Sequence, residues 1–112
     1  MLSSRTQIKR GSAEVAILAV LESGALHGYE IAKSIERETD GALSFNLASL
    51  YPTLYRLEKR GWVKGTWEAK ATGRRRRYYR LTASGAKRLA SLGKEWSAFF
   101  QALSRLVGVA RA

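Results

Sequence analysis

The sequence predicts a mainly helical fold with a small β-hairpin: a winged helix-turn-helix domain followed by one long C-terminal helix. Three observations carry this prediction. Apolar residues recur at helical spacing in three successive segments before residue 61, the period becomes that of strands between residues 63 and 81, and helical spacing then returns without a break. Three helices followed by a hairpin make a winged helix-turn-helix, a fold that lays one helix into the major groove of DNA.

The order of these segments divides the 112 residues into three parts. They are an N-terminal arm at 1–11, the winged helix-turn-helix domain at 12–82 and a C-terminal dimerisation helix at 83–112. The first helix is expected to begin at Ser12, a residue type that caps helix N-termini, and to end at Gly24. Its apolar stripe is expected along Val15, Leu18 and Ala19.

Two more helices are expected before the period changes. One runs from about Gly28 to Thr39 and is stopped by Gly41. The next begins within Asn46–Ser49 and closes before Gly61, because Pro52 is tolerated only in or near a first turn. Its core stripe repeats at spacings of three and four along Leu47, Leu50, Leu54 and Leu57.

The hairpin and the last helix complete the expected fold. Alternate residues share a face in each of two extended segments, which are Val63, Gly65 and Trp67 in the first and Tyr79 and Leu81 in the second. A basic loop that contains Gly73 joins them. Thr82 then caps a long helix, whose apolar seam is Leu89, Leu92, Trp96, Phe99, Leu103 and Leu106. So small a domain cannot bury this seam alone, which predicts a homodimer.

Charge is distributed unevenly along the chain. Residues 1–55 carry five basic and six acidic side chains, a net of −1, whereas residues 56–112 carry fifteen and three, a net of +12. A positive field confined to one part of a small domain indicates a surface that binds a polyanion. Arg outnumbers Lys, which favours phosphate because the planar guanidinium fork matches phosphate oxygens. With the predicted fold, this makes double-stranded DNA the expected partner.

Composition excludes several function classes. The chain has no cysteine and one histidine, so thiol chemistry and Cys- or His-based metal sites are excluded, and we expect His27 to be structural and no cofactor to be bound. The longest apolar run, Val15–Leu21, is far shorter than the ~20 residues of a membrane-spanning helix. We therefore expect no membrane partner and, without an N-terminal signal segment, a cytoplasmic location. The basic half holds only Glu58, Glu68 and Glu95 for acid–base work, so we expect no enzyme.

The third helix carries a polar stripe that is expected on the side away from its leucines. Ser49, Thr53, Arg56 and Arg60 follow one another at spacings of four, three and four. Small hydroxyl side chains near a helix start suit base edges, and the later arginines suit phosphates. A solvated helix face has the same pattern, but the basic hairpin that follows favours DNA binding.

The expected wing carries four consecutive arginines, Arg74–Arg77, beside Gly73 at its tip. Because the run leads into a strand, its side chains should alternate between the two faces, so that not all four reach the same phosphate path. Those nearest Gly73 are expected to contact the DNA backbone or enter a minor groove.

Three motifs resemble those of the PadR-like transcriptional regulators. They are Leu50-Tyr51-Pro52-Thr53-Leu54-Tyr55-Arg56-Leu57-Glu58-Lys59-Arg60-Gly61, the upstream His27-Gly28-Tyr29-Glu30-Ile31, and Gly73-Arg74-Arg75-Arg76-Arg77-Tyr78-Tyr79-Arg80-Leu81-Thr82. The resemblance spans roughly Val15 to Leu106. It implies a winged-helix repressor that forms a homodimer through its C-terminal helix, as in the short-tailed subgroup of that family.

The resemblance also places Tyr51 and Thr53 at the start of the recognition helix and Tyr79 in the second wing strand. Each tyrosine is then either part of the core or a phosphate contact. Together, the residue patterns and the resemblance give one set of expected DNA-binding residues: Asn46, Ser49, Tyr51, Thr53, Arg56, Gly73, Arg74, Arg75, Arg76 and Tyr79.

A ligand site is expected where the last helices of two chains meet. Trp96 is too bulky for a tight two-helix seam, and Phe99 and Phe100 follow one turn later, so paired rings could hold a planar aromatic or cationic guest. The resemblance supports this site, because multidrug-responsive members of the short-tailed subgroup bind flat compounds between a tryptophan pair of this helix. In the alternative interpretation Trp96 only fills the dimer core. The expected seam and effector residues are Leu89, Leu92, Trp96, Phe99, Phe100, Leu103 and Leu106.

Two functions remain after these exclusions. The first is a sequence-specific repressor, a homodimer on a pseudo-palindromic operator that a small planar aromatic effector releases. The second is a general RNA-binding or architectural DNA-binding protein without an effector, since the charge would serve it equally. The seam distinguishes them, because a two-fold dimer requires two half-sites about one helical turn apart.

Overall fold

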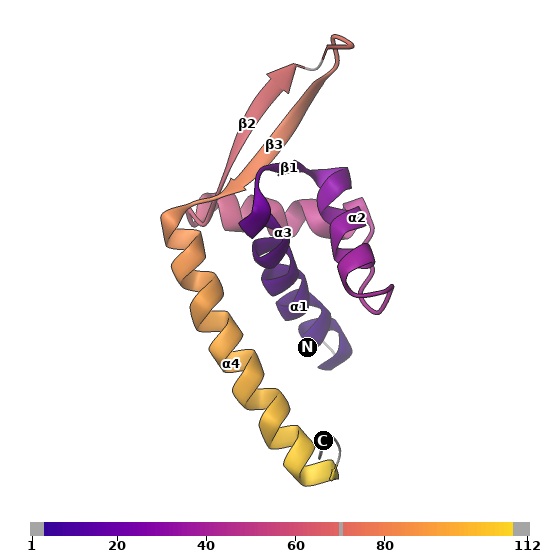
Figure 1. The fold of residues 1–112 in the computed structure, drawn as a ribbon, viewed down its shortest axis with the longest axis vertical. Coiled ribbons are helices and arrows are strands. Elements are labelled where there is room, and N and C mark those ends of the chain that lie inside the picture. Colours follow the sequence, from indigo (N-terminus) through magenta and orange to yellow (C-terminus); the bar gives the residue numbers. More distant parts are fainter. Residues whose placement is uncertain (1–3, 70, 109–112) are drawn as a thin grey trace.

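A computed structural model describes residues 4–69 and 71–108, with residues 4–10 through their backbone alone. The elements in this part of the chain are α1 (Ser4–Val20), the 3-10 turn η1 (Leu21–Ser23), β1 (Leu26–His27), α2 (Gly28–Glu38), α3 (Leu47–Lys59), β2 (Val63–Ala69), β3 (Arg75–Leu81) and α4 (Ala83–Val107). Hairpin β2–β3 projects from a body of three helices, and α4 leaves the foot of the hairpin in the opposite direction (Figure 1). The predicted winged helix-turn-helix with a long C-terminal helix is confirmed.

Helix α1 begins earlier than predicted. It starts at Ser4, so Ser12 lies inside the helix and is not its N-cap, and residues 4–11 of the expected arm are helical. Residues 1–3 lie outside the described part. The buried face also differs, because Ile17 and Leu18 are fully buried whereas Ala19 is exposed. The segment 15–21 is apolar all round, so its periodicity could not identify the face that meets the core.

Helix α2 follows its prediction, and its two caps explain its bounds. His27 and Glu30 form a capping box: His27 Nδ1 accepts from the Glu30 backbone N–H at 3.3 Å, and the Glu30 carboxylate accepts from the His27 N–H at 3.2 Å. At the other end, the Gly41 N–H donates to the Glu36 carbonyl at 2.8 Å and Gly41 has a φ of 80°. This is the left-handed turn that a helix-ending glycine provides.

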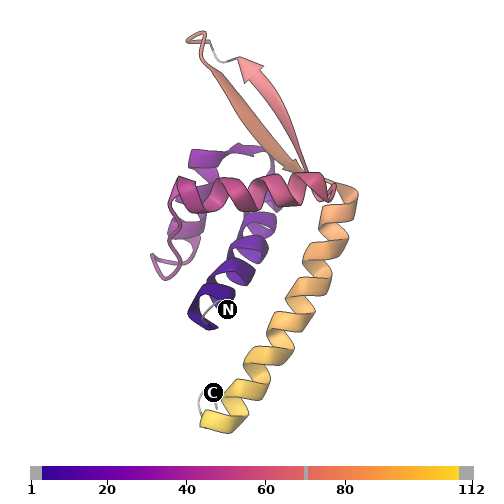
Figure 2. The same ribbon diagram turned by 180° about the vertical axis from the view of Figure 1, so that it is seen from behind.

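Helix α3 also lies within its predicted bounds. The Asn46 side chain accepts from the Ser49 N–H at 2.8 Å and so caps the N-terminus. Pro52 lies in the second turn, where it removes one backbone hydrogen bond from an otherwise regular helix. Seen from behind, α3 lies across the body at the foot of the wing (Figure 2).

The wing is an antiparallel hairpin whose register runs from Val63↔Leu81 to Ala69↔Arg75. A third strand, β1, pairs with β3, so the strand order is β1-β3-β2. The sequence did not predict β1, because a strand of two residues is too short to show a period. It ties the start of α2 to the base of the wing.

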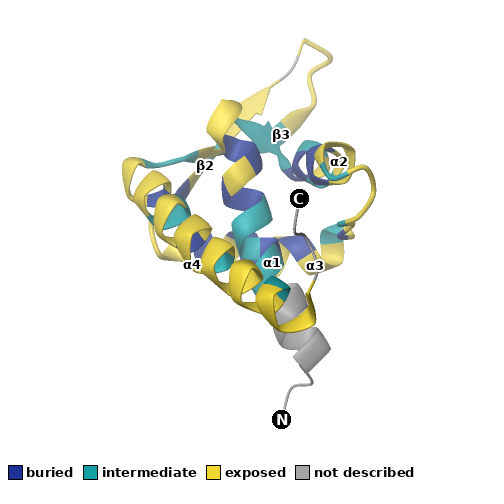
Figure 3. Cartoon of the chain, turned by 60° about the horizontal axis from the view of Figure 1, so that its bottom comes forward, coloured by how far each residue is buried: buried dark blue, intermediate teal, exposed yellow. Residues whose placement is uncertain are grey.

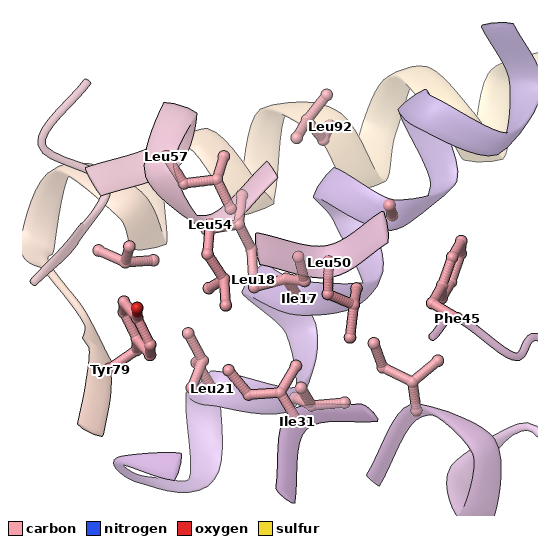
Figure 4. Packing of buried hydrophobic residues seen from close by; sticks show 14 residues of the cluster. Ile17, Leu18, Leu21, Ile31, Phe45, Leu50, Leu54, Leu57, Tyr79 and Leu92 are labelled. Carbon is pink, nitrogen blue, oxygen red and sulfur yellow. The ribbon is translucent and has the colours of Figure 1, made fainter. Parts of the chain in front are cut away.

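The core lies where α1, α2, α3 and the sheet meet. Figure 4 shows Ile17 and Leu18 of α1 beside Leu54 of α3, with Tyr79 of β3 closing one side. The predicted leucine stripe of α3 is buried from Leu50 onward, and Leu47 is half-buried. This packing fixes the face that α3 turns outward.

Helix α4 is anchored at its start and free at its end. The Thr82 hydroxyl accepts from the Gly85 N–H at 2.9 Å, as predicted for an N-cap, and donates to the Gly61 carbonyl at 2.6 Å.

None of the described helices is long and apolar enough to cross a membrane.

The apolar seam of α4 divides into two halves with different surroundings. Leu92 is buried in the chain's own core, and Leu89 and Trp96 pack against that core beside α1. The distal residues are exposed, among them Phe99 and Leu106, and Figure 3 shows this outer part of α4 as mostly exposed. Helix α1 thus covers the first half of the seam, and the distal half stays exposed, in agreement with the expectation that so small a domain does not bury the seam alone.

Candidate nucleic-acid interface

A groove of about 620 Å³ lies between the wing, the N-terminal half of α3 and the start of α2. Its walls combine the arginine run 74–77 with exposed aromatic side chains: Tyr29, Tyr51, Tyr55 and Trp67. Among the described residues that line the groove, none is acidic. A surface that combines positive charge with exposed aromatic rings is suited to binding nucleic acid.

The wing divides its arginines between two faces, as the strand prediction requires. The guanidinium carbons of Arg75 and Arg77 lie 5.6 and 5.7 Å from the ring centroid of Trp67, so these three side chains share one face. Arg76 lies on the other face, with Nη1 3.4 Å from Nε2 of His27. Cation–π contact with Trp67 holds Arg75 in place while leaving it exposed.

The tip of the wing is shaped by Gly73, whose φ of 83° is in the left-handed region that favours glycine. Arg74 follows it and is exposed, as is Arg75. The expected tip residues are thus accessible together at the far end of the hairpin.

Arg77 is held differently from its neighbours. Its Nη2 donates to Oε2 of Glu58 on α3 at 2.5 Å. Burial disfavours the charged guanidinium, but the hydrogen bond and the negative charge of Glu58 outweigh it, so the pKa of Arg77 is raised. Arg77 therefore stays charged, with a carboxylate as its partner.

The outward face of α3 presents three expected residues at its N-terminal end. Asn46 and Ser49 are exposed, although the side-chain amide oxygen Oδ1 of Asn46 already accepts from the Ser49 N–H as the helix cap. Tyr51 is 36% exposed and stacks on Tyr55 with 6.4 Å between ring centroids. Its hydroxyl lies over Gly28, where an added Cβ would approach to 2.7 Å, so Tyr51 also joins α3 to the start of α2.

Two expected DNA contacts are buried instead. Thr53 is only 4% exposed, and the Arg56 guanidinium donates to its hydroxyl at 3.1 Å. The expectation that Thr53 lies away from the leucines is wrong, because it precedes Leu54 and follows Leu50 by three residues, at the border of the buried stripe. Arg56 covers Thr53 and is itself half-buried.

Tyr79 is the second expected DNA contact that is buried, with 1% of its surface exposed. Of the two alternatives for this residue, the structure supports the core. Burial, opposed in part by the charge of Arg77, raises the pKa of Tyr79, so its hydroxyl stays neutral.

Sequence reasoning missed three aromatic residues of the groove. Tyr55 is 60% exposed and Tyr29 is 53% exposed, and Trp67 projects from the wing. A helical wheel signals Tyr55, which follows Tyr51 by four residues and so shares its face. Trp67 becomes visible only through the hairpin register, which places it opposite Arg77.

A second group of aromatic rings lies on α4. Trp96 is half-buried over Gly11 of α1, and its ring centroid lies 6.1 Å from that of Phe99 and 5.7 Å from that of Phe100. Both phenylalanines are more than half exposed. Within the described residues, no group of three or more His, Asp or Glu side chains is placed to hold a metal ion.

Comparison with known proteins adds family information to this geometry. The sequence model of the transcriptional regulator PadR-like family matches residues 17–91. An uncharacterized protein of Lysinibacillus sphaericus is 33% identical over 93 residues, which are 83% of this chain and 85% of that protein.

Two solved structures share the fold over almost the whole chain. A transcriptional regulator from Clostridium thermocellum is 34% identical with a TM-score of 0.81, over 96% of this chain and 99% of that one. A PadR-like transcriptional regulator from Bacillus cereus is 26% identical with a TM-score of 0.75, over 90% and 96%. The matched region includes α3 and the wing.

Proposed function

The chain belongs to the transcriptional regulator PadR-like family, and we propose that it is a repressor that binds a pseudo-palindromic DNA operator as a homodimer. Members of this family regulate transcription, so the chain is a DNA-binding transcriptional regulator and not an enzyme. The cytoplasmic location expected from the sequence is consistent with binding to chromosomal DNA.

The groove between α3 and the wing is the observation that carries the proposal. We place the N-terminal half of α3 in the major groove, with Ser49 toward base edges and Tyr51 at the backbone. Arg74, Arg75 and Arg76 then contact the backbone or the minor groove beside it. Thr53 and Tyr79 are left out of this interface because both are buried.

The distal half of α4 supports the dimer. Phe99, Leu103 and Leu106 are 51%, 40% and 82% exposed at spacings of four and three, so this helix presents an unburied apolar stripe to solvent. A second copy of the same helix, related by a two-fold axis, covers the stripe and sets the distance between the two recognition helices.

Substitution tests this dimer better than truncation does. Removing the chain after Ser91 would also remove Leu92 from the core. Leu103→Glu with Leu106→Glu leaves the core intact and should give a monomer in sedimentation analysis, with operator affinity lost. Gln101→Glu places a similar charge on an exposed position of the same helix and should remain a dimer. A doubly substituted protein that stays dimeric and keeps its operator affinity contradicts the proposed interface.

The aromatic group on α4 supports a small planar effector. We propose that Trp96, Phe99 and Phe100 bind its rings near the dimer axis and that binding spreads the two α4 helices. A movement of α4 can reach the DNA-binding part through the start of that helix, where the Thr82 hydroxyl donates to the carbonyl of Gly61 in the turn between α3 and β2. The guanidinium carbons of Arg60 and Arg88 lie 5.2 and 5.0 Å from the centroid of the Trp62 ring, which follows that turn.

Fluorescence of a single tryptophan tests the effector site. In a Trp62→Phe, Trp67→Phe background, planar aromatic dyes should quench Trp96 and lower operator affinity together. If dyes change neither while the dimer persists, Trp96 only packs over Gly11 and the effector site is absent from α4.

A general nucleic-acid-binding protein is the second candidate function. The exposed rings of Tyr55 and Trp67 beside arginines favour it, because such surfaces stack unpaired bases without sequence preference. Competition binding separates the two functions: the repressor should prefer a duplex inverted repeat over a scrambled duplex and over single-stranded RNA of equal length. Equal affinity for all three would favour the second function.

A further inference from the structure

Three elements meet at one carboxylate beside the foot of the wing. Oε2 of Glu58, in the last turns of α3, accepts from Nη2 of Arg77 on β3 at 2.5 Å and from the backbone N–H of Gly65 on β2 at 3.3 Å. Both strands of the wing are thereby bonded to the same atom of the recognition helix. We call Glu58, Gly65 and Arg77 the wing clamp.

Gly65 makes room for this arrangement. A Cβ at this position would lie 2.7–2.8 Å from atoms of the Arg77 guanidinium, so that side chain crosses a bare stretch of backbone. The rings of Trp67 and Tyr79 flank it, with centroids 5.7 and 5.9 Å from the guanidinium carbon. Rings, backbone and carboxylate thus contact Arg77 on several sides, and its side chain is 30% exposed.

The clamp differs from the rest of the arginine run. In the described part of the chain, Arg77 is the member of run 74–77 that pairs with a carboxylate. A guanidinium whose charge is already balanced by a carboxylate gains less by approaching a phosphate than an unpaired one does. Glu58 itself adds negative charge to the basic half of the chain, which by charge alone opposes DNA binding.

The position of the clamp indicates its role. α3 and the wing contact different parts of a duplex, whose grooves and backbone have fixed separations, so the angle between them decides whether both contacts form together. A wing fixed in advance avoids the entropy cost of ordering it on binding. Glu58 lies near the C-terminal end of α3, where its two bonds join that helix to both strands of the wing.

We propose that Arg77 is a positioning residue: held by Glu58 across Gly65, it locks the wing onto the recognition helix and sets the spacing of the DNA contacts, and it does not neutralise a phosphate. This rests on the proposed DNA-binding function. The clamp itself is a property of the free protein and can be tested without DNA.

Paired carboxylate variants test the sign of the effect. Glu58→Gln and Glu68→Gln each remove one negative charge, but Glu68 is exposed in β2, where its carboxylate accepts from the Thr66 hydroxyl at 3.5 Å and lies 3.8 Å from Arg80, and it has no bond to α3 among the described residues. Charge alone predicts tighter DNA binding for both. The clamp predicts tighter or equal operator binding for Glu68→Gln and about tenfold weaker binding for Glu58→Gln. Equal gains in both variants would overturn it.

Paired arginine variants test the phosphate contact. Arg75→Met removes an exposed guanidinium on the same face and should flatten the salt dependence by about 0.9 per protomer. Arg77→Met should weaken operator binding while the slope stays that of the wild type, and Glu58→Gln added to it should cost little more. If Arg77→Met flattens the slope as Arg75→Met does, Arg77 contacts a phosphate and the proposal fails.

Spin labels measure the wing without DNA. The chain has no cysteine, so nitroxides on Thr72→Cys in the loop and Ala48→Cys on α3 report one distance when labelled chains are diluted in unlabelled ones. The distance distribution should broaden in Glu58→Gln, Arg77→Met and Gly65→Ala, and stay narrow in Glu68→Gln and Arg75→Met. Unchanged distributions overturn the clamp. Broadened ones support it even if the wild type prefers no operator, which would refute only the proposed function.

Discussion

Replacing Arg74 and Arg75 by Ala should flatten the salt dependence of DNA binding. Both side chains are exposed at the wing tip, and neither pairs with a carboxylate within the described residues. Each phosphate contacted contributes about −0.9 to the slope of log affinity against log salt. Two contacts per protomer are four per dimer, so the variant's slope should be shallower by about 3.6.

Fluorescence anisotropy of a labelled operator and of a scrambled duplex measures this slope. Between about 50 and 200 mM KCl, the double variant should lose about 150-fold less affinity than the wild type does. Both duplexes should be affected alike, because phosphate contacts carry no sequence information. Arg105→Ala, an exposed change near the end of α4, is the control and should leave the slope unchanged. Parallel salt plots for wild type and double variant would refute contact between the wing and DNA.

Three further predictions concern stability and specificity. A Cβ at Gly85 would overlap the backbone carbonyl oxygen of Trp62, so Gly85→Ala should lower the free energy of unfolding in urea by about 1–3 kcal/mol. Gly93 has open space around it, so Gly93→Ala should raise the free energy of unfolding by about 0.5–1 kcal/mol. Equal effects of the two variants would contradict this packing. Because burial raises the pKa of Tyr79, the unfolded chain loses that proton first, and the free energy of unfolding should fall as pH rises above about 10. Tyr79→Phe should lessen this fall, and an identical fall would show that Tyr79 does not cause it. Finally, Ser49→Ala should change operator preference measured on a panel of half-site variants, while Thr53→Ala should lower thermal stability with preference retained; the reverse result would show that Thr53 reads bases.

The helices could be predicted because local chemistry marks their ends. Asn46 and Thr82 each accept a hydrogen bond from the backbone N–H three residues later, and Gly41 has the left-handed conformation that ends α2. These interactions involve residues close in sequence, so pattern alone locates them. The same holds for the wing, whose arginine run and Gly73 lie in one short segment.

What could not be predicted depends on contacts between distant residues. Thr53 lies at the border of a helical stripe, where the packing of α3 against its neighbours, and not the period of the helix, decides burial. The pairing of Arg77 with Glu58 requires the hairpin register and the approach of α3, neither of which a periodicity contains. For the same reason the sequence shows one continuous seam on α4, whereas α1 covers Leu92 and leaves Leu106 exposed.

Selection from a pool of random duplexes by the purified protein tests the central claim most directly. A two-fold dimer that reads DNA with α3 should enrich inverted repeats whose half-site centres lie about 10–10.5 base pairs apart, or a multiple of that distance. The Leu103→Glu, Leu106→Glu variant should enrich no such repeat. Enrichment of single unrepeated sites, or of no sequence at all, by the wild-type protein would contradict the account of a dimeric, operator-specific regulator.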